Sequence, residues 1–274
     1  MVKPKTHVVF LLDKSGSMGK IRSQAVEYYN EQRQQIIENS KDQDITVSLF
    51  TFNSNVFEHE LLVPANELPE ITLENYVPNG GTAWYDAMGY AITKLQEITE
   101  ADENTAYLIV SITDGKDFNS RYYGTPQDAS PLRKLISECE CSKRWTFSYL
   151  GCSKANLDHV AKEVGIPLAN MGLWNAESET TAAASLQRST VRSKNFYAAR
   201  AAGQLCSVNY YSDVDAVADF TQPVESIVCE HQKPATKKSD SFDSFHPKES
   251  VLNNLGDRQP FVKVDLDRWR SKIS

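Results

Sequence analysis

The sequence predicts a doubly wound α/β fold with a mainly parallel sheet and one antiparallel edge strand. Apolar runs at 7–12 and 105–113 have the length and composition of strands buried on both faces, and they alternate with segments of helical periodicity. Two runs rich in β-branched and aromatic residues, 44–52 and 56–63, are joined by a turn at 53–55, which is typical of a β-hairpin. Strands that alternate with helices favour right-handed crossovers and therefore parallel pairing.

The same periodicity predicts the other elements in chain order. We expect helices at about 18–39, from 80 to 98, around 132–136, at 155–164 and at about 178–202, and strands at 144–150 and about 168–173. The irregular stretch 64–78 contains three prolines and is expected to be a loop.

Periodicity weakens towards the C-terminal end. We therefore expect one domain over 5–205 and a C-terminal extension over 206–274. Residues 232–250 are rich in Ser, Lys, Pro and Asp, a composition that predicts a disordered linker. The stretch 261–273 alternates weakly, and we expect it to dock on the body or on a partner.

Composition and charge exclude several classes of function. The net charge of −7 is uneven: residues 231–274 carry nine basic and six acidic side chains, net +3, so the remainder carries −10. An acidic body is a poor surface for nucleic acid, so we do not expect a nucleic-acid partner.

No apolar run reaches the roughly 18 residues of a membrane span, and the run 8–12 is too short for a signal-peptide core. We therefore expect a cytoplasmic protein without membrane contact. Cys139, Cys141 and Cys152 lack the second close pair of a zinc site, so we interpret them as buried or idle thiols.

Oxygen-bearing side chains follow two buried strands and precede one helix. Ligands of parallel sheets bind beyond the carboxyl ends of the strands, so three segments are expected to meet there. The predicted metal ligands are Asp13, Ser15, Ser17, Thr82 and Asp114. All five offer hard oxygen atoms, which suit Mg²⁺, with Mn²⁺ or Ca²⁺ as alternatives.

The spacing has a physical basis. In a loop just past a strand, alternate residues can turn towards one point, so positions 13, 15 and 17 can share an ion. Gly16 relaxes the backbone of this loop, and Gly80 and Gly81 let the second loop approach closely. Each residue alone has an ordinary structural explanation, as a helix cap or a turn residue, but the three-part coincidence at one sheet edge does not.

Three motifs together resemble the metal-ion-dependent adhesion site (MIDAS) of von Willebrand factor A (VWA) domains. They are Asp-x-Ser-x-Ser at 13–17 after the first strand, Gly-Gly-Thr at 80–82 before a helix, and Thr-Asp-Gly at 113–115 after the next buried strand. The resemblance covers about residues 5 to 200 and implies the Rossmann-like VWA fold. It also implies that Ser15, Ser17 and Thr82 bind the ion directly, while Asp13 and Asp114 lie in the second shell or alternate with water.

The resemblance further implies a protein-binding role instead of catalysis. An open position on the ion would accept an acidic residue of a partner protein. The run Tyr85-Asp86-Ala87 is similar to that of intracellular bacterial or phage members of the family, whose partners are often AAA+ ATPases or stress-response assemblies. Lys116 and Asp117 are interpreted as shaping the partner surface.

Two other functions remain open at this stage. A metal-dependent phosphatase or nucleotide hydrolase could use Asp13 as a nucleophile, but Ser15 stands where such an enzyme needs its acid/base carboxylate. A purely structural subunit would use the sheet and the tail for assembly. Trp84 and Tyr85 would either contact a partner or pack in the core.

Overall fold

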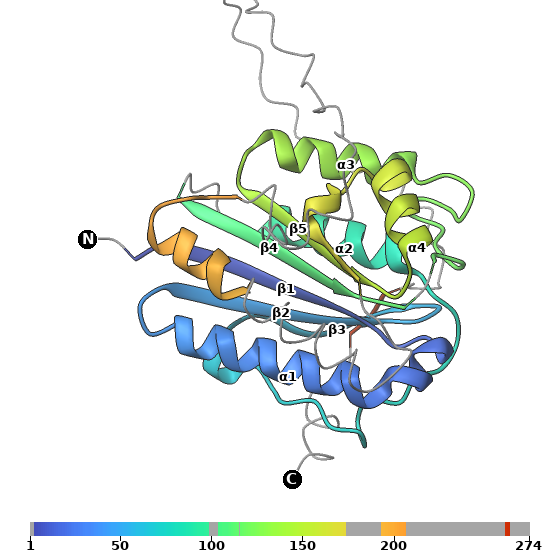
Figure 1. Cartoon of the computed structure of the whole chain (residues 1–274), viewed down its shortest axis with the longest axis horizontal. Helices are drawn as coiled ribbons and strands as arrows, with labels where there is room; N and C mark the ends of the chain where they lie inside the picture. Colours follow the sequence, from blue (N-terminus) through green and yellow to red (C-terminus); the bar gives the residue numbers. More distant parts are fainter. Residues whose placement is uncertain (1–2, 99–103, 115, 174–192, 207–260, 264–274) are drawn as a thin grey trace, which may run out of the picture.

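The computed structural model describes residues 3–98, 104–114, 116–173, 193–206 and 261–263 (Figure 1). The strands are β1 (Lys5–Asp13), β2 (Asp44–Phe52), β3 (Val56–Pro64), β4 (Thr105–Ile112), β5 (Trp145–Gly151), β6 (Met171–Leu173) and β7 (Phe261–Lys263). The α-helices are α1 (Arg22–Asn39), α2 (Trp84–Ile98), α3 (Ser130–Cys141) and α4 (Lys154–His159), and residues 193–201 are also helical. Short turns of 3-10 helix are η1 (Gly16–Ile21), η2 (Ala65–Glu67) and η4 (Leu168–Asn170), and η3 (Val160–Val164) is a π-helical turn.

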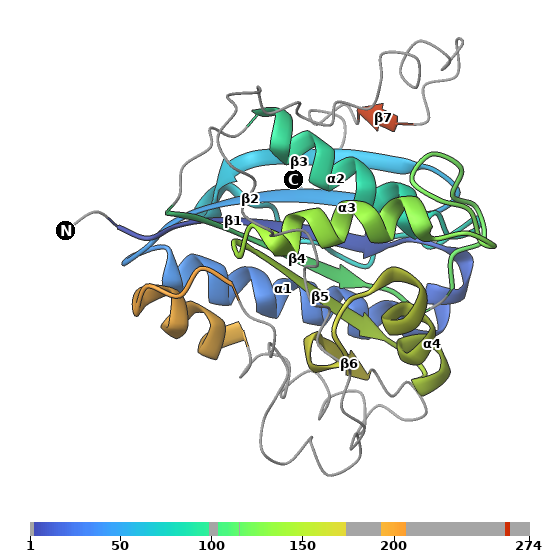
Figure 2. The same cartoon turned by 90° about the horizontal axis from the view of Figure 1, so that it is seen from above.

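The strands form one sheet in the order β6-β5-β4-β1-β2-β3-β7 (Figures 1 and 2). The central strand β1 pairs in parallel with β2 and β4, and β4, β5 and β6 continue the parallel pairing. The hairpin strand β3 runs antiparallel to β2, as predicted. The short β7 extends the sheet beyond β3, with which it pairs in parallel.

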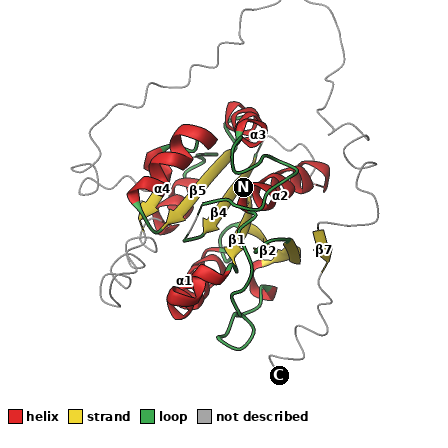
Figure 3. Cartoon of the chain, turned by 90° about the vertical axis from the view of Figure 1, so that its right-hand side faces the viewer, coloured by secondary structure: helices red, strands yellow, loops and turns green. Residues whose placement is uncertain are grey.

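Helices cover both faces of the sheet, which confirms the doubly wound architecture (Figure 3). The side chains of β1 show the division, because successive residues of a strand point to opposite faces. Val8, Phe10 and Leu12 pack with α1, whereas Val9 and Leu11 pack with α2 and α3. Every residue of β1 after Lys5 is buried, as expected for the centre of a sheet covered on both sides.

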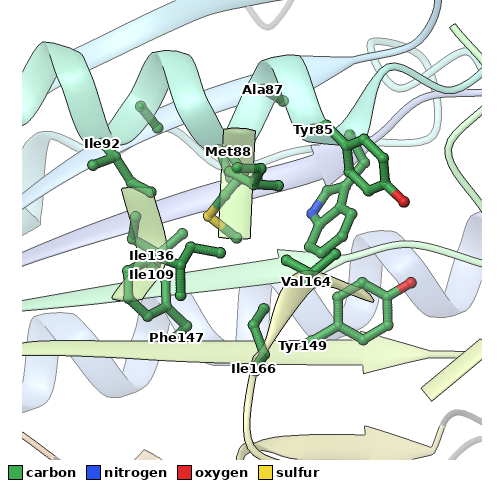
Figure 4. Close-up of a cluster of buried hydrophobic side chains, with 14 of the residues drawn as sticks. Tyr85, Ala87, Met88, Ile92, Ile109, Ile136, Phe147, Tyr149, Val164 and Ile166 are labelled. Carbon is green, nitrogen blue, oxygen red and sulfur yellow. The ribbon is translucent and has the colours of Figure 1, made fainter. Parts of the chain in front are cut away.

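A cluster of buried aliphatic and aromatic side chains fills the core on the α2 side of the sheet (Figure 4). The rings of Trp84 and Tyr149 meet edge to face with centroids 4.9 Å apart, and Trp84 Nε1 donates to Ser111 Oγ at 3.0 Å. Trp84 and Tyr85 are both 2% exposed. Of the two roles considered for this pair, core packing is the one that the structure bears out.

The helical residues 193–201 lie on the same face of the sheet as α1, and this segment confirms the C-terminal part of the helix expected at 178–202. Phe196 and Tyr197 enter the α1 core. Arg200 is buried and donates to Thr6 Oγ1 at 3.1 Å and to the Lys5 carbonyl at 2.9 Å. This segment therefore joins the body where β1 begins. The expected helix residues 178–192 and the expected linker at 232–250 lie outside the described residues.

Some boundaries differ from the prediction. The helix expected from Gly80 begins at Trp84, because the carbonyl groups of Gly80 and Thr82 accept hydrogen bonds from neighbouring loops instead of from the helix. The Ala83 carbonyl accepts the Ala87 N–H. The helix expected at 155–164 changes to a π-helical turn at Val160 and ends at Gly165, whose φ of +92° suits glycine. In the part of the chain that is described, no helix has the length and apolar character needed to cross a membrane.

Candidate metal centre

The carboxyl group of Asp13 joins the ends of the two central strands. Asp13 is the last residue of β1 and is fully buried. Its Oδ1 accepts a hydrogen bond of 2.7 Å from the Ser15 N–H, and its Oδ2 accepts one of 2.6 Å from the Thr113 hydroxyl just past β4. The loops that follow β1 and β4 therefore meet at this carboxyl group.

The predicted serine ligands continue from Asp13 towards the surface. Ser15 Oγ lies 3.1 Å from Ser17 Oγ, and the Ser17 hydroxyl donates to Asp114 Oδ1 at 2.8 Å. Ser15 is buried and Ser17 is exposed. Four of the five predicted residues thus form one hydrogen-bonded set that reaches from the core to the solvent.

The loop of Thr82, the fifth predicted residue, lies against the first loop. The Gly16 N–H donates to the Gly80 carbonyl at 3.0 Å, and the Asn79 N–H donates to the Lys14 carbonyl at 2.8 Å. The two loops that carry the predicted ligands are therefore hydrogen-bonded to each other. Thr82 itself is buried.

The glycines of the second loop are needed for its conformation. Gly80 has a φ of +74°, which glycine adopts without strain. A Cβ atom on Gly81 would lie 1.8 Å from Asn119 Oδ1. That oxygen accepts the Thr82 N–H at 3.0 Å, so the missing side chain of Gly81 lets Asn119 hold Thr82 in place.

The hairpin turn at 53–55 supports the same loop. The Ala83 N–H donates to the Asn53 carbonyl at 2.6 Å, and the Gly81 N–H donates to Ser54 Oγ at 2.8 Å. The sequence indicated only a turn here. Its contact with the site depends on β2 lying beside β1, which places the turn next to residues 79–83.

Tyr76 is a buried residue that holds the backbone of Asp13, and the sequence did not indicate this role. Its hydroxyl group donates to the carbonyl of Asp13, and Arg22 Nε donates to the Tyr76 carbonyl at 2.7 Å. Burial and the nearby Asp13 and Asp114 raise the pKa of Tyr76, so the group is a neutral hydrogen-bond donor. It lies in the irregular stretch 64–78, where no local pattern marks a tyrosine as part of a site.

Two further acidic residues, Asp117 and Asp86, support the loop that follows β4. Asp117 was predicted at the wrong place, and Asp86 was not predicted to have a role. Asp117 was expected at the partner surface with Lys116. Only Lys116 is exposed; Asp117 is buried and accepts hydrogen bonds from Tyr85 N at 2.9 Å and from Ser120 N at 3.0 Å. The interpretation of Asp117 is therefore corrected: its carboxyl group satisfies an N–H in the first turn of α2. The carboxyl group of Asp86 accepts the N–H groups of residues 121, 122 and 123 at 2.8–3.0 Å.

The electrostatics of the centre favour a cation. Burial, with a smaller effect of Asp114 and against the hydrogen bonds from Thr113 and Ser15, raises the pKa of Asp13 to about 7. Burial also raises the pKa of Asp114, while Ser17 and Lys20 lower it. Two carboxyl groups that are disfavoured as anions by burial would be stabilised in that form by a nearby positive charge.

The donor set fits a hard divalent ion. It consists of two carboxyl groups and three hydroxyl groups and contains no nitrogen or sulfur, which matches the oxygen preference of Mg²⁺ and Ca²⁺. Among the described residues, no group of three or more His, Cys, Asp or Glu side chains is arranged to hold a metal ion. A metal site here therefore depends on the hydroxyl groups of Ser15, Ser17 and Thr82.

No protein-family model and no curated protein sequence matches this chain. Among solved structures, it is similar to a von Willebrand factor type A protein from Catenulispora acidiphila, with 17% identity and a TM-score of 0.49 over 69% of this chain and 42% of the other. It is also similar to the PilB minor pilin from Streptococcus sanguinis, with 15% identity and a TM-score of 0.48 over 71% of this chain and 62% of the pilin. The D319A mutant of that pilin aligns at 13% identity and a TM-score of 0.44, over 72% and 63%. This chain thus spans less than two thirds of the length of each.

Proposed function

We propose that this chain is a divalent-metal-dependent protein-binding module, in which an acidic residue of a partner docks onto a bound Mg²⁺ ion. The observation that carries the proposal is the hydrogen-bonded set Asp13, Ser15, Ser17 and Asp114, which extends from a buried carboxyl group to an exposed hydroxyl group at the sheet edge. When bound, the ion supplies a positive charge that accepts a carboxylate oxygen from outside.

The hydroxyl groups are suited to direct binding. Ser17 donates its only proton to Asp114, so Ser15 is the donor in the bond between the two serine hydroxyls. The Ser17 oxygen therefore keeps one lone pair that can face a cation. Hydroxyl ligands are neutral, so an ion held by Ser15, Ser17 and Thr82 keeps more of its charge than one held by three carboxylates. That remaining charge favours an acidic partner.

The two carboxyl groups would orient the direct ligands. Each oxygen of Asp13 already accepts a hydrogen bond, from Ser15 N–H and from Thr113, which leaves one lone pair on each for a bound water. Asp114 holds the Ser17 hydroxyl in position. This arrangement supports an indirect role for both acids.

Calorimetric titration with Mg²⁺ and Mn²⁺ tests the metal site. We expect the wild type to bind, Asp13→Ala to lose binding, and Ser17→Ala to bind about tenfold or more weakly, because a ligand is removed. Ser23→Ala, at an exposed serine outside the site, is the matched control and should bind as the wild type does. Equal binding by the wild type and Asp13→Ala would exclude the site.

Affinity capture in Mg²⁺ and in EDTA, followed by mass spectrometry, tests the metal dependence of partner binding. On the resemblance to intracellular members of the VWA family, a cytoplasmic AAA+ ATPase or stress-response assembly is the first partner to look for. Partners retained equally in EDTA would instead indicate a structural assembly subunit. Phosphatase or nucleotidase turnover in Mg²⁺ that is lost in Asp13→Asn would indicate an enzyme.

A further inference from the structure

An exposed aromatic side chain stands beside the candidate metal centre. Phe118 is 68% exposed, more than any other large hydrophobic side chain in the described part of the chain. It lies in the loop that follows β4, four residues after Asp114. A single exposed phenylalanine is common on protein surfaces, so its surroundings decide whether it has a role.

The loop that presents Phe118 is held firmly. Asp117, the residue before it, is buried and bonded to Tyr85 N–H and to the N–H and hydroxyl of Ser120. Further along the same loop, residues 121–123 donate their N–H groups to the carboxyl group of Asp86. The exposure of Phe118 is therefore a property of a fixed backbone, and a partner would order little of this loop on binding.

Phe118 is also joined directly to a predicted metal ligand. The N–H groups of Phe118 and Asn119 each donate to the Thr82 carbonyl at 2.9 Å, and Asn119 Oδ1 accepts the Thr82 N–H. Three hydrogen bonds thus hold Thr82 and the base of the Phe118 side chain in one unit. Phe118 is therefore fixed next to the loop that carries Thr82.

A second exposed apolar side chain, Val77, lies on another segment of the site. Val77 is 47% exposed and follows Tyr76, whose hydroxyl group is bonded to the Asp13 carbonyl. Two residues later, the Asn79 N–H is bonded to the Lys14 carbonyl. Val77 is therefore anchored at both sides to the loop that begins at Asp13.

The exposed charges of the two loops that follow β1 and β4 are mostly basic, although the chain has a net charge of −7. The segment 64–78, which carries Val77, has exposed Glu67, Glu70 and Glu74 instead. In the described residues of 14–22 and 113–129, the exposed charged side chains are Lys20, Lys116, Arg121 and Asp128. The positive excess of the loops after β1 and β4 favours an acidic partner segment, and it disfavours a symmetric pair in which these same loops of two copies face each other.

We propose that Phe118, with Val77, selects among partners, and that the preferred partner segment presents an acidic residue with large apolar residues beside it. The acidic contact rests on the proposed metal-dependent function, whereas the contact with Phe118 does not require the ion. An exposed aromatic on a rigid loop next to a central polar contact is the arrangement of an interface hot spot.

Synthetic fluorescent peptides provide the probe, measured by anisotropy with the full chain. One peptide has a central Glu flanked by Leu, the second has the same Glu flanked by Ser, and the third has Gln flanked by Leu. Each is titrated in Mg²⁺ and in EDTA against the wild type, Phe118→Ser and the conservative Phe118→Leu. Because Phe118 is exposed, Phe118→Ser should fold, and its thermal midpoint and Mg²⁺ affinity should match the wild type.

In Mg²⁺, we expect the Leu-flanked Glu peptide to bind the wild type about tenfold more tightly than the Ser-flanked one, the effect of one interface aromatic. Phe118→Ser should remove this preference and Phe118→Leu should keep most of it. A preference that survives Phe118→Ser, a wild type that ignores the flanking residues, or no binding by any peptide would each overturn the proposal. So would a Phe118→Ser effect confined to binding of phosphatidylserine vesicles.

The two proposals fail in different ways. If the Leu-flanked peptides bind equally with Glu or Gln and equally in EDTA, but still require Phe118, the metal-dependent function is wrong and the role of Phe118 stands. If binding requires Glu and Mg²⁺ but ignores the flanking residues, the metal-dependent function stands and the role of Phe118 is wrong.

Discussion

The Thr113 hydroxyl donates a hydrogen bond of 2.6 Å to Oδ2 of Asp13, and this bond links the ends of the adjacent parallel strands β1 and β4. Both residues are buried, so neither group has water as an alternative partner. The bond therefore contributes to stability as well as to the position of the candidate metal centre.

Thr113→Val keeps the shape of the side chain and removes the donor. We expect the free energy of unfolding in urea to fall by about 1–3 kcal/mol, because a buried carboxyl oxygen loses its hydrogen bond. Thr113→Ser retains the hydroxyl group and should lose less. A Thr113→Val protein as stable as the wild type would show that the bond is not needed.

Gly81→Ala should weaken Mg²⁺ binding if the proposed site is correct. The new Cβ would displace Asn119, and Thr82 would lose the acceptor for its N–H. Loss of one positioning hydrogen bond should lower the affinity about fivefold to tenfold in calorimetry. Gly19→Ala is the matched control, because a Cβ there meets no atom within 4 Å. Equal losses in both variants would contradict the role of the close approach.

Acid should destabilise the protein partly through His59. Its Nε2 lies 2.7 Å from Thr51 Oγ1, and burial, with a smaller effect of Lys14, lowers its pKa from 6.5 to about 4. Between pH 6.5 and pH 4 the unfolded chain binds a proton at this residue that the folded chain does not, so stability falls as the pH falls through this range. At 1.36 kcal/mol for each pKa unit, the loss approaches about 3 kcal/mol. Unfolding in urea at several pH values should show a smaller loss for His59→Gln; parallel curves for the two proteins would contradict this.

Arg200 should be hard to replace, even by lysine. Its guanidinium group donates to Thr6 Oγ1 and to the carbonyl groups of Lys5, Gln204 and Asn104, an arrangement that needs several donors in fixed directions. We expect Arg200→Lys to lower the unfolding free energy by about 2 kcal/mol. Lys194→Arg, at an exposed position on the same helical segment, should have little effect and is the control. An Arg200→Lys protein as stable as this control would show that stability does not require the several hydrogen bonds of the guanidinium group.

Local patterns in the sequence were enough to predict the order of the elements. The run 7–12 is apolar because both faces of β1 are covered, and the turn residues 53–55 mark the hairpin that reverses the chain. The same reasoning placed the loops after β1 and β4 at one sheet edge, where Asp13, Ser15, Ser17 and Asp114 are indeed connected. This succeeded because the carboxyl ends of neighbouring parallel strands must meet.

The sequence by itself determined the candidate ligands and the sheet edge at which they gather, since both follow from residue type and strand order. Only the tertiary structure decided what holds them: Tyr76 on Asp13, 63 residues away, and Asn119 on Thr82, 37 residues away. Only the tertiary structure also showed that Asp117 is buried at the start of α2 instead of lying at the surface, and that the adjacent Phe118 is exposed. The physical reason is that a hydrogen-bond partner far along the chain depends on how loops pack together, and an isolated Tyr, Asn or Asp carries no local pattern that records that packing.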